Sequence, residues 1–205
     1  QQGDSGSHSL ERYIEHVSDA LGQQAQPVFL IGHDLGGMVI SGVAERYPQR
    51  VQHLIYLAAY LLPSGDSVLS RMQVDRNQNA LAALNYTDDQ RFVSISADQA
   101  RRYLYNRCDS QDVETALRAI RPQASFPLMS ANKLSEQNFG SVPRSYIRCM
   151  QDHMISPATQ AEFVAELPCQ RVVDLDADHA PFLSASDVLA RKLLDLAAQA
   201  MTQAA

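Results

Sequence analysis

Apolar and polar positions along the chain follow two recurring patterns. Short, continuous apolar runs rich in β-branched residues are typical of strands buried in a parallel sheet, and stretches with helical spacing separate them. The apolar runs predict strands at residues 28–31, 51–59, 145–150 and 171–175. The helical spacing predicts helices at 10–22 (after a Ser9 N-cap), 36–47, 157–167 and 185–198. Strands that alternate with helices indicate an α/β fold with a mostly parallel sheet covered on both faces.

One long segment breaks this alternation. Residues 61–140 are polar, are rich in Asn, Asp, Gln and Ser, and carry helical patches at 97–107 and 111–121. We expect a single domain over residues 1–205, with this segment inserted between two sheet strands as a helical lid. The first predicted strand reads as buried on both faces, and at the edge of a four-stranded sheet it would need a neighbour. We therefore expect that N-terminal strands of the domain are missing from this chain.

Composition bears on the cellular compartment of the protein and on the classes of molecule that it can bind. The 205 residues are 45% hydrophobic, which suits one sizeable core. A formal net charge of -6 without a basic run argues against nucleic acid as a partner. No stretch approaches the ~20 apolar residues of a membrane span, so we expect no membrane partner. Cys108, Cys149 and Cys169 lack CxxC spacing, which argues against a zinc site and favours a reducing, cytoplasmic setting.

The sequence Gly-His-Asp-Leu-Gly-Gly at residues 32–37 lies between a predicted strand and a predicted helix. A strand that runs through Gly-x-x-x-Gly into a helix predicts a sharp turn, known as a nucleophile elbow, which exposes the central side chain above the sheet. The helix N-terminus favours a carboxylate at Asp34. An ionised Asp can attack a carbon that bears a leaving group and form an alkyl-enzyme ester, which a base-activated water hydrolyses; Ser would attack a carbonyl instead.

A nucleophile of either kind needs a histidine partner, and the chain order expected on this fold is nucleophile, acid, histidine. His179 follows the last predicted strand and Asp152 follows the strand before it, so both lie with Asp34 at the carboxyl ends of parallel strands. We expect His179 to act as general base and Asp152 to fix its tautomer and stabilise its imidazolium. Three nearby carboxylates are rivals for the role of the acid: Asp174, Asp176 and Asp178.

Several segments resemble a known family: GHDLGGMVIS, AERYPQRVQHLIYLAAYLLPSGDS, YIRCMQDHMISPATQ and DADHAPFLSASDVL. Residues 9–196 resemble the α/β-hydrolase superfamily and, within it, the branch of small methylesterases and hydroxynitrile lyases. The resemblance implies a nucleophile at position 34, an acid at Asp152, a base at His179 and an oxyanion hole that uses the Leu35 backbone N–H. Members of that branch carry Ser where this chain has Asp34. They also begin with further strands and a His-Gly loop that donates a second oxyanion contact, and neither is found in these residues.

The Asp form of the turn is similar to that of epoxide hydrolases and haloalkane dehalogenases, which attack carbon through Asp. Those dehalogenases typically place Trp beside the nucleophile to hold halide, whereas this chain has Leu35 there and no tryptophan. Epoxide hydrolases use lid tyrosines as acids, and Tyr103 and Tyr105 lie in the predicted lid. Two positions apart on a helical pattern, they face different sides, so at most one faces the site. His33 is expected to pack and hydrogen-bond beside the nucleophile, at the border of the substrate.

These observations predict a hydrolase that acts on a small, apolar, ester-like or epoxide substrate through Asp34, Asp152 and His179, without a cofactor or metal. Two alternatives stay open. In the first, Asp in place of Ser has silenced the site, and the protein binds a small molecule without turnover. The second is a hydroxynitrile lyase, which would need a Ser–His pair and a cationic residue near the nitrile. A small molecule is the expected partner, and a homodimer is compatible with the sequence.

Overall fold

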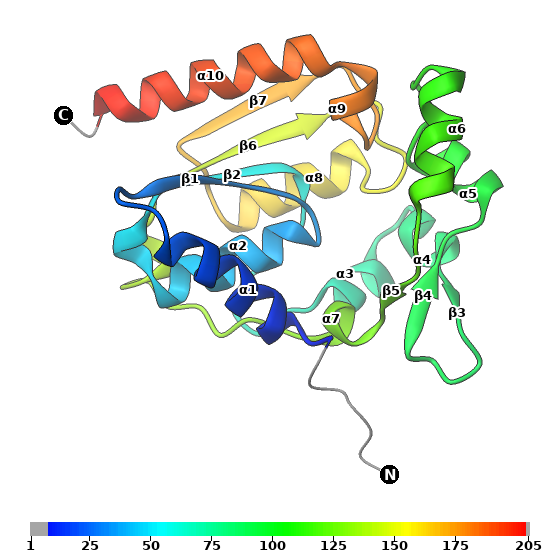
Figure 1. The fold of residues 1–205 in the computed structure, drawn as a ribbon, viewed down its shortest axis with the longest axis horizontal. Helices are drawn as coiled ribbons and strands as arrows, with labels where there is room; N and C mark the ends of the chain where they lie inside the picture. The colour runs from blue at the N-terminus through cyan, green and yellow to red at the C-terminus, as the bar shows by residue number, and fades with distance from the viewer. Residues whose placement is uncertain (1–7, 204–205) are drawn as a thin grey trace.

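The computed structural model describes residues 8–203, which form a central parallel sheet covered by helices (Figure 1). The four strands lie in the order β1-β2-β6-β7, and each neighbouring pair is parallel. Their bounds are Val28–Asp34 for β1, Val51–Ala59 for β2, Arg144–Cys149 for β6 and Arg171–Leu175 for β7. The predicted α/β class and all four predicted strands are therefore confirmed, although β1 extends to Asp34.

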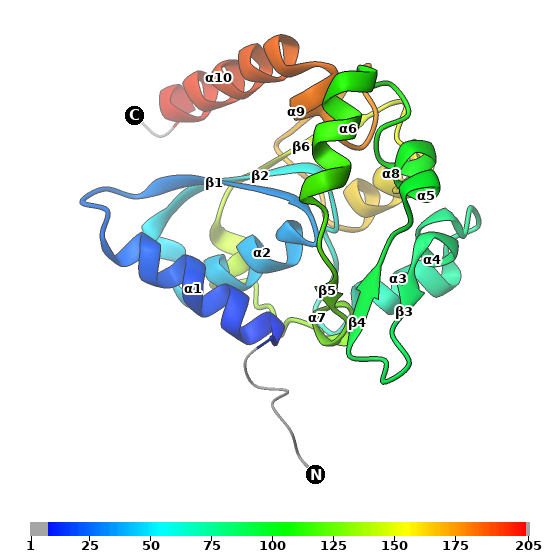
Figure 2. The same cartoon turned by 45° about the vertical axis from the view of Figure 1, so that its right-hand side comes forward.

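Helices cover both faces of this sheet. On one face lie α1 (Leu10–Gly22), α2 (Gly36–Arg46) and α8 (Pro157–Glu166), and on the other lies α10 (Ser186–Gln203) (Figures 1 and 2). Because successive side chains of a strand point to opposite faces, β2 contributes to two cores. Leu54 and Tyr56 pack in the core on the α2 side, and Ile55 and Leu57 pack in the core on the α10 side. None of the helices within residues 8–203 is both long and apolar enough to cross a membrane.

The inserted segment, residues 61–140, forms a group of short elements beside the carboxyl ends of the strands (Figures 1 and 2). The helices predicted at 97–107 and 111–121 are present but shorter. A three-stranded antiparallel sheet, β3-β4-β5, was not predicted, because strands of two or three residues are too short to show a period. The role of the segment as a lid stays a prediction.

The elements of the inserted segment are α3 (Val68–Val74), α4 (Asn79–Ala83), β3 (Asn85–Tyr86), β4 (Phe92–Ser94), α5 (Ala97–Tyr103), α6 (Ser110–Ala119), β5 (Gln123–Ala124), α7 (Phe126–Met129) and η2 (Phe139–Ser141). Two short elements lie outside it: η1 (Pro48–Arg50), between α2 and β2, and α9 (Pro181–Ser184), before α10.

The expectation that the first strand is buried on both faces is wrong for this structure. Ile31, in the middle of β1, is 49% exposed. The reason is its place in the sheet: within residues 8–203, β1 pairs with β2 on one side only and forms one edge of the sheet. The expectation that further strands complete this edge stays a prediction.

The turn from β1 into α2 brings backbone segments unusually close together. A Cβ atom added to Gly32 would lie 2.6 Å from the carbonyl oxygen of Gly36, and one added to Gly37 would lie 2.4 Å from the carbonyl oxygen of Tyr60. A Cβ added to Gly36 would meet nothing within 4 Å. The turn therefore needs glycine at positions 32 and 37. The second glycine of the Gly-x-x-x-Gly pattern, Gly36, has room for a side chain.

We expect Gly37→Ala to lower the free energy of unfolding by about 1–3 kcal/mol, because the new methyl group overlaps the Tyr60 carbonyl and the backbone has to shift. The matched control, Gly36→Ala, should change it by less than about 0.5 kcal/mol, because its methyl group enters open space. Urea unfolding followed by circular dichroism measures both values. Equal stability of the two variants would contradict the steric account of the turn.

Candidate active site

Asp34 ends β1 in a left-handed backbone conformation, with φ of 52°. This conformation is uncommon for residues other than glycine and is often found where strain serves function. The Leu35 backbone N–H faces the Asp34 carboxylate and favours its charged form. The pKa of Asp34 is raised, first by burial and then by the charge of Asp152, while the charge of His179 and the Leu35 N–H oppose the rise. The N–H expected to serve an oxyanion hole thus lies beside the carboxylate itself.

His179 and Asp152 are paired by a hydrogen bond. The distance from His179 Nδ1 to Asp152 Oδ2 is 2.8 Å, and both side chains are buried. The other oxygen, Asp152 Oδ1, accepts from the backbone N–H groups of Met154 at 2.7 Å and Ile155 at 2.9 Å. These backbone bonds hold the carboxylate in place, so that its second oxygen fixes the orientation of the imidazole ring.

Gln160, on α8, forms hydrogen bonds with the loop that carries Asp152. The sequence pattern did not identify it as a site residue. Its side chain is fully buried, and its amide nitrogen donates to Asp152 Oδ2 at 3.2 Å and to the Ile155 carbonyl at 2.7 Å. Its amide oxygen accepts from the Cys149 N–H at 3.0 Å. The signal that could have found it is a glutamine on the apolar side of the predicted helix 157–167, three positions before the buried Phe163.

The charges around His179 favour its protonated form. Burial by itself lowers the pKa of the imidazole, but the charge and hydrogen bond of Asp152 and the charges of Asp34 and Asp178 outweigh it and raise the pKa to about 9. At neutral pH the imidazole of His179 is therefore protonated in the resting site. Loss of that proton is needed before His179 can act as a base.

His33 lies against the imidazole ring of His179. Its Nε2 is 2.7 Å from the backbone carbonyl oxygen of His179, and because a carbonyl only accepts, His33 donates this bond. Its ring centroid is 4.5 Å from that of His179 and 5.3 Å from that of Phe182. Burial, followed by the charge of His179, lowers the pKa of His33 to about 3, so the ring is neutral. Contact between His33 and a substrate stays a prediction.

A cavity of about 140 Å³ lies beside Asp34. Most of its lining comes from the inserted segment and is apolar, including Met72, Val93, Ile95, Leu104 and Leu128. Its polar lining consists of Asp34, Ser94, Arg121 and Gln123. This volume is close to that of cavities that hold a benzene-sized molecule, of about 150 Å³. The sequence did not indicate these residues, because they are scattered over a segment without a clear period.

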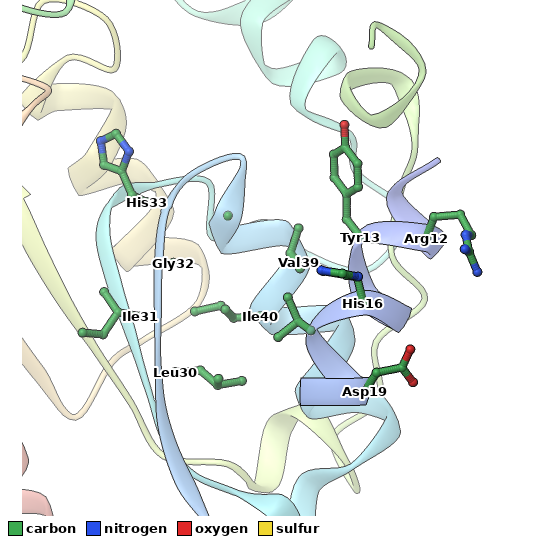
Figure 3. Close-up of a pocket in the computed structure, with 12 residues that line it drawn as sticks. Arg12, Tyr13, His16, Asp19, Leu30, Ile31, Gly32, His33, Val39 and Ile40 are labelled. Atoms are coloured by element: carbon green, nitrogen blue, oxygen red, sulfur yellow. The ribbon is translucent and has the colours of Figure 1, made fainter. Parts of the chain in front are cut away.

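A larger hollow, of about 600 Å³, lies between α1 and the outer edge of β1 (Figure 3). Tyr13 and His16 line it from α1, and Leu30 and Ile31 line it from β1. Its lining includes neither Asp34 nor the Asp152–His179 pair. The smaller cavity is therefore the candidate active site, because it is the one that borders a reactive group.

Tyr103 and Tyr105, which the sequence placed in the predicted lid, lie outside the lining of the 140 Å³ cavity. Tyr103 lines a separate pocket of about 500 Å³ together with Arg102 and His153, and the Arg102 guanidinium lies 5.3 Å from the centre of its ring. Tyr105 is half-buried, and burial raises the pKa of its hydroxyl. A role of either tyrosine as an acid toward substrate stays a prediction.

The three rival acids have other partners. Asp174 pairs with Arg148 at 2.7 Å, Asp176 accepts from the Gln151 amide at 3.0 Å, and Asp178 accepts from the Arg107 backbone N–H at 2.8 Å. The geometry therefore brings Asp152, rather than these carboxylates, to His179 Nδ1. Within residues 8–203, no group of three or more His, Cys, Asp or Glu side chains is arranged to hold a metal ion.

Relatives share this fold over most of the chain. The chain is 31% identical to "Putative methylesterase 11, chloroplastic" of Arabidopsis thaliana, covering 94% of this chain and 52% of that protein. It is 30% identical to a pyrethroid hydrolase of Sphingobium wenxiniae, covering 95% of this chain and 73% of that protein. The chain spans about half the length of the first chloroplastic relatives it matches, at 52%, 45% and 45%.

Solved structures agree with the sequence relatives. A pyrethroid hydrolase from Sphingobium faniae JZ-2 matches with a TM-score of 0.84 and 27% identity, covering 96% of this chain and 82% of that chain. Polyneuridine aldehyde esterase matches with a TM-score of 0.80 and 23% identity, covering 93% and 80%, which shows the shared fold. A family model described as "Alpha/beta hydrolase family" matches residues 2–192. The chain therefore belongs to the alpha/beta hydrolase family.

Proposed function

We propose that this protein is a hydrolase of small, largely apolar substrates of the ester-like or epoxide class. One observation carries the proposal: Asp34 stands on a strained strand-to-helix turn beside an apolar cavity, and its charge acts on a histidine that is hydrogen-bonded to Asp152. Nucleophile, base and orienting acid are the three parts of a hydrolytic triad. The family relationship supports the same reaction class.

The proposed reaction has two steps. An oxygen of Asp34 attacks a substrate carbon and the bond from that carbon to its leaving oxygen breaks. An alkyl ester of Asp34 forms, and the alkoxide released takes a proton from the His179 imidazolium. His179, now neutral, takes a proton from water, and the hydroxide formed attacks the Asp34 carboxyl carbon. The Leu35 N–H, beside this carboxyl group, stabilises the resulting oxyanion. Collapse of this intermediate breaks the ester bond, and the leaving alkoxide takes the proton back from His179. The Asp34 carboxylic acid then gives its proton to His179, which restores the carboxylate and the imidazolium.

Asp34 determines which bond is broken. Attack of a carboxylate on the acyl carbon of an ester gives a mixed anhydride, which is more reactive than the ester and gains nothing as an intermediate. Attack on a saturated, electrophilic carbon gives a stable alkyl ester, and an epoxide offers such a carbon together with ring strain. A serine at the same position would instead attack the acyl carbon of an ester. The proposal is thus epoxide-type attack on an esterase scaffold.

The cavity sets the size of the substrate. Its volume of about 140 Å³ suits a benzene-sized group, and its mainly apolar lining favours such a group over a charged one. Because the inserted segment supplies most of this lining, we propose that it acts as a lid that excludes water from Asp34. Small aryl and alkyl epoxides, and p-nitrophenyl esters of short acids, are the substrates to test.

We expect the protein with Asp34 to open small epoxides, and Asp34→Ser to lose that activity at least about 10³-fold while it gains cleavage of p-nitrophenyl esters. His179→Ala should lose at least about 10³-fold of either activity, because both reactions need the base. Diol formation and p-nitrophenol release measure the two activities. Trapping of an alkylated Asp34 in His179→Ala, detected by mass spectrometry, would identify the intermediate.

Two results would contradict this proposal. If only Asp34→Ser is active, and the Asp34 protein binds a product alcohol without turning over any substrate, Asp34 silences an esterase site. If neither form turns over esters or epoxides, the triad itself is wrong. The activity of Asp34→Ser distinguishes these two results. Calorimetric binding of the product alcohol then tests whether the cavity of the Asp34 protein still takes a ligand.

The pH dependence follows from the raised pKa of His179. Hydrolysis of the alkyl ester needs neutral imidazole, so its rate should rise with pH and then level off. Because esterified Asp34 carries no charge, the midpoint should lie below the value of about 9 that holds for the resting site. Asp152→Asn removes the main cause of the raised pKa, and we expect the midpoint to move to lower pH. Single-turnover decay of the alkyl ester, formed on proteins that keep His179, gives the profile. Asp174→Asn, a matched change on the surface pair with Arg148, should leave it at the wild-type midpoint. An unchanged midpoint in Asp152→Asn would contradict the pairing.

The same pair should make stability depend on pH. The pKa of His179 is raised from its ordinary value of 6.5 to about 9 in the folded state, so its contribution to stability is complete below pH 6.5 and is lost as the pH rises through about 9. We expect the wild type to lose stability over this window relative to Asp152→Asn, as measured by urea unfolding at a series of pH values. Parallel pH curves for the two proteins would contradict the expected linkage.

A further inference from the structure

A second buried carboxylate directly precedes the proposed base. Asp178 has an exposed fraction of 0% and is adjacent to His179 in the chain. None of the ion pairs formed within residues 8–203 includes it. Burying a carboxylate without a cation is costly unless hydrogen bonds surround it. The source of its hydrogen-bond donors therefore indicates what this residue holds together.

The two oxygens of Asp178 contact different parts of the molecule. Oδ1 accepts from the Ala180 backbone N–H at 3.1 Å and from the Ser184 hydroxyl at 2.7 Å, both on the side of the base loop and α9. Oδ2 accepts from the Arg107 backbone N–H at 2.8 Å and from the Cys108 thiol at 3.3 Å, both in the connection between α5 and α6. One carboxylate thus joins the base loop to the inserted segment.

The same connection also contacts the loop of the acid. The Asn106 side-chain amide donates to the carbonyl oxygen of Gln151 at 3.0 Å, and Gln151 immediately precedes Asp152. The Gln151 backbone N–H donates to the Ala177 carbonyl at 2.9 Å, which links the acid loop to the base loop. Residues 106–108 therefore contact both loops that carry the His179–Asp152 pair.

We propose that Asp178 is a positioning residue, which uses the connection at residues 106–108 to hold the His179 loop in register with Asp152 and Asp34. The inference rests on the proposed function in that it takes His179 to be the base. Asp178 acts through His179 and the inserted segment, without touching substrate. Because the same carboxylate bonds both sides, the attachment of the inserted segment and the orientation of the His179 ring depend on each other.

The chemistry of the donors explains why this position needs a carboxylate. Both oxygens of Asp178 accept from N–H, O–H or S–H groups, and the backbone N–H groups of Ala180 and Arg107 cannot reverse their direction. An asparagine keeps one acceptor and turns an NH₂ group toward one of these donors, so one side of the bridge is lost. The charge of Asp178 also adds to those of Asp152 and Asp34 in raising the pKa of His179.

The test compares Asp178→Asn with Asp174→Asn, which makes the same chemical change on a carboxylate that pairs with Arg148. Hydrogen exchange measured by mass spectrometry reports on the connection at residues 106–108, and an NMR titration reports the pKa of the His179 imidazole. We expect Asp178→Asn to speed exchange of the Arg107 amide at least about tenfold and to lower the pKa of His179. Asp174→Asn should leave the Arg107 amide at its wild-type exchange rate.

Activity gives a third readout. With a substrate that the wild type turns over, Asp178→Asn should lower kcat about tenfold or more and leave KM within about twofold, because the base is misplaced while the cavity remains. Exchange and titration do not need turnover, so they decide on Asp178 even if the proposed hydrolysis fails. The proposal would be overturned if the exchange rate of the Arg107 amide and the pKa of His179 in Asp178→Asn both match those in Asp174→Asn.

A milder variant covers the case in which Asp178→Asn does not fold. Ser184→Ala removes one donor to Oδ1 and no charge, so the fold is retained while the bridge is weakened. We expect it to speed exchange of the Arg107 amide about two- to fivefold, although Ser184 itself bonds only the base-loop side. Unchanged exchange of that amide in Ser184→Ala would show that the two sides of Asp178 are not coupled, and would overturn the proposal.

Discussion

Helix α2 begins so close to the end of β2 that a single added methyl group would collide with backbone: a Cβ on Gly37 would lie 2.4 Å from the Tyr60 carbonyl oxygen. This contact places the turn against a stretch of β2 where the pairing with β1 shifts and Ala58 has φ of 42°. Asp34 and Ala58 each cost about 1–3 kcal/mol as left-handed residues, and the packed sheet around them offsets that strain. The strained turn lifts the Asp34 side chain out of the strand and toward the cavity.

Once the turn is fixed, electrostatics govern the site. His179 is buried beside Asp152, Asp34 and Asp178, and their charges together outweigh the effect of burial on its pKa. Asp152 and Asp178 are in turn held by backbone N–H groups, which supply positive partial charge in addition to the imidazolium. This arrangement keeps the carboxylates in fixed directions around one imidazole, which is the preorganisation that a hydrolytic reaction needs.

The relatives identify the fold of the chain, and the residue at position 34 determines which atom can attack a substrate. Family membership and the match to esterase and pyrethroid hydrolase structures establish the scaffold. The atom that attacks is decided locally, because a carboxylate and a hydroxyl on the same turn prefer different carbons. Under the proposed function, Asp at position 34 directs attack to an alkyl carbon where Ser would attack an acyl carbon, while Asp152 and His179 activate water in either case.

The sequence by itself determined the strands, the main helices and the placement of Asp34, Asp152 and His179 at strand ends, because these depend on local periodicity and on a topology that brings strand ends together. The tertiary structure decided which carboxylate meets His179. Asp152 and Asp178 both follow strands, yet Asp152 reaches the ring across 27 residues of chain and Asp178 turns toward the inserted segment. It also decided the cavity lining and the exposure of Ile31. Side-chain direction across separate loops and the presence of a neighbouring strand are long-range properties, which no local pattern encodes.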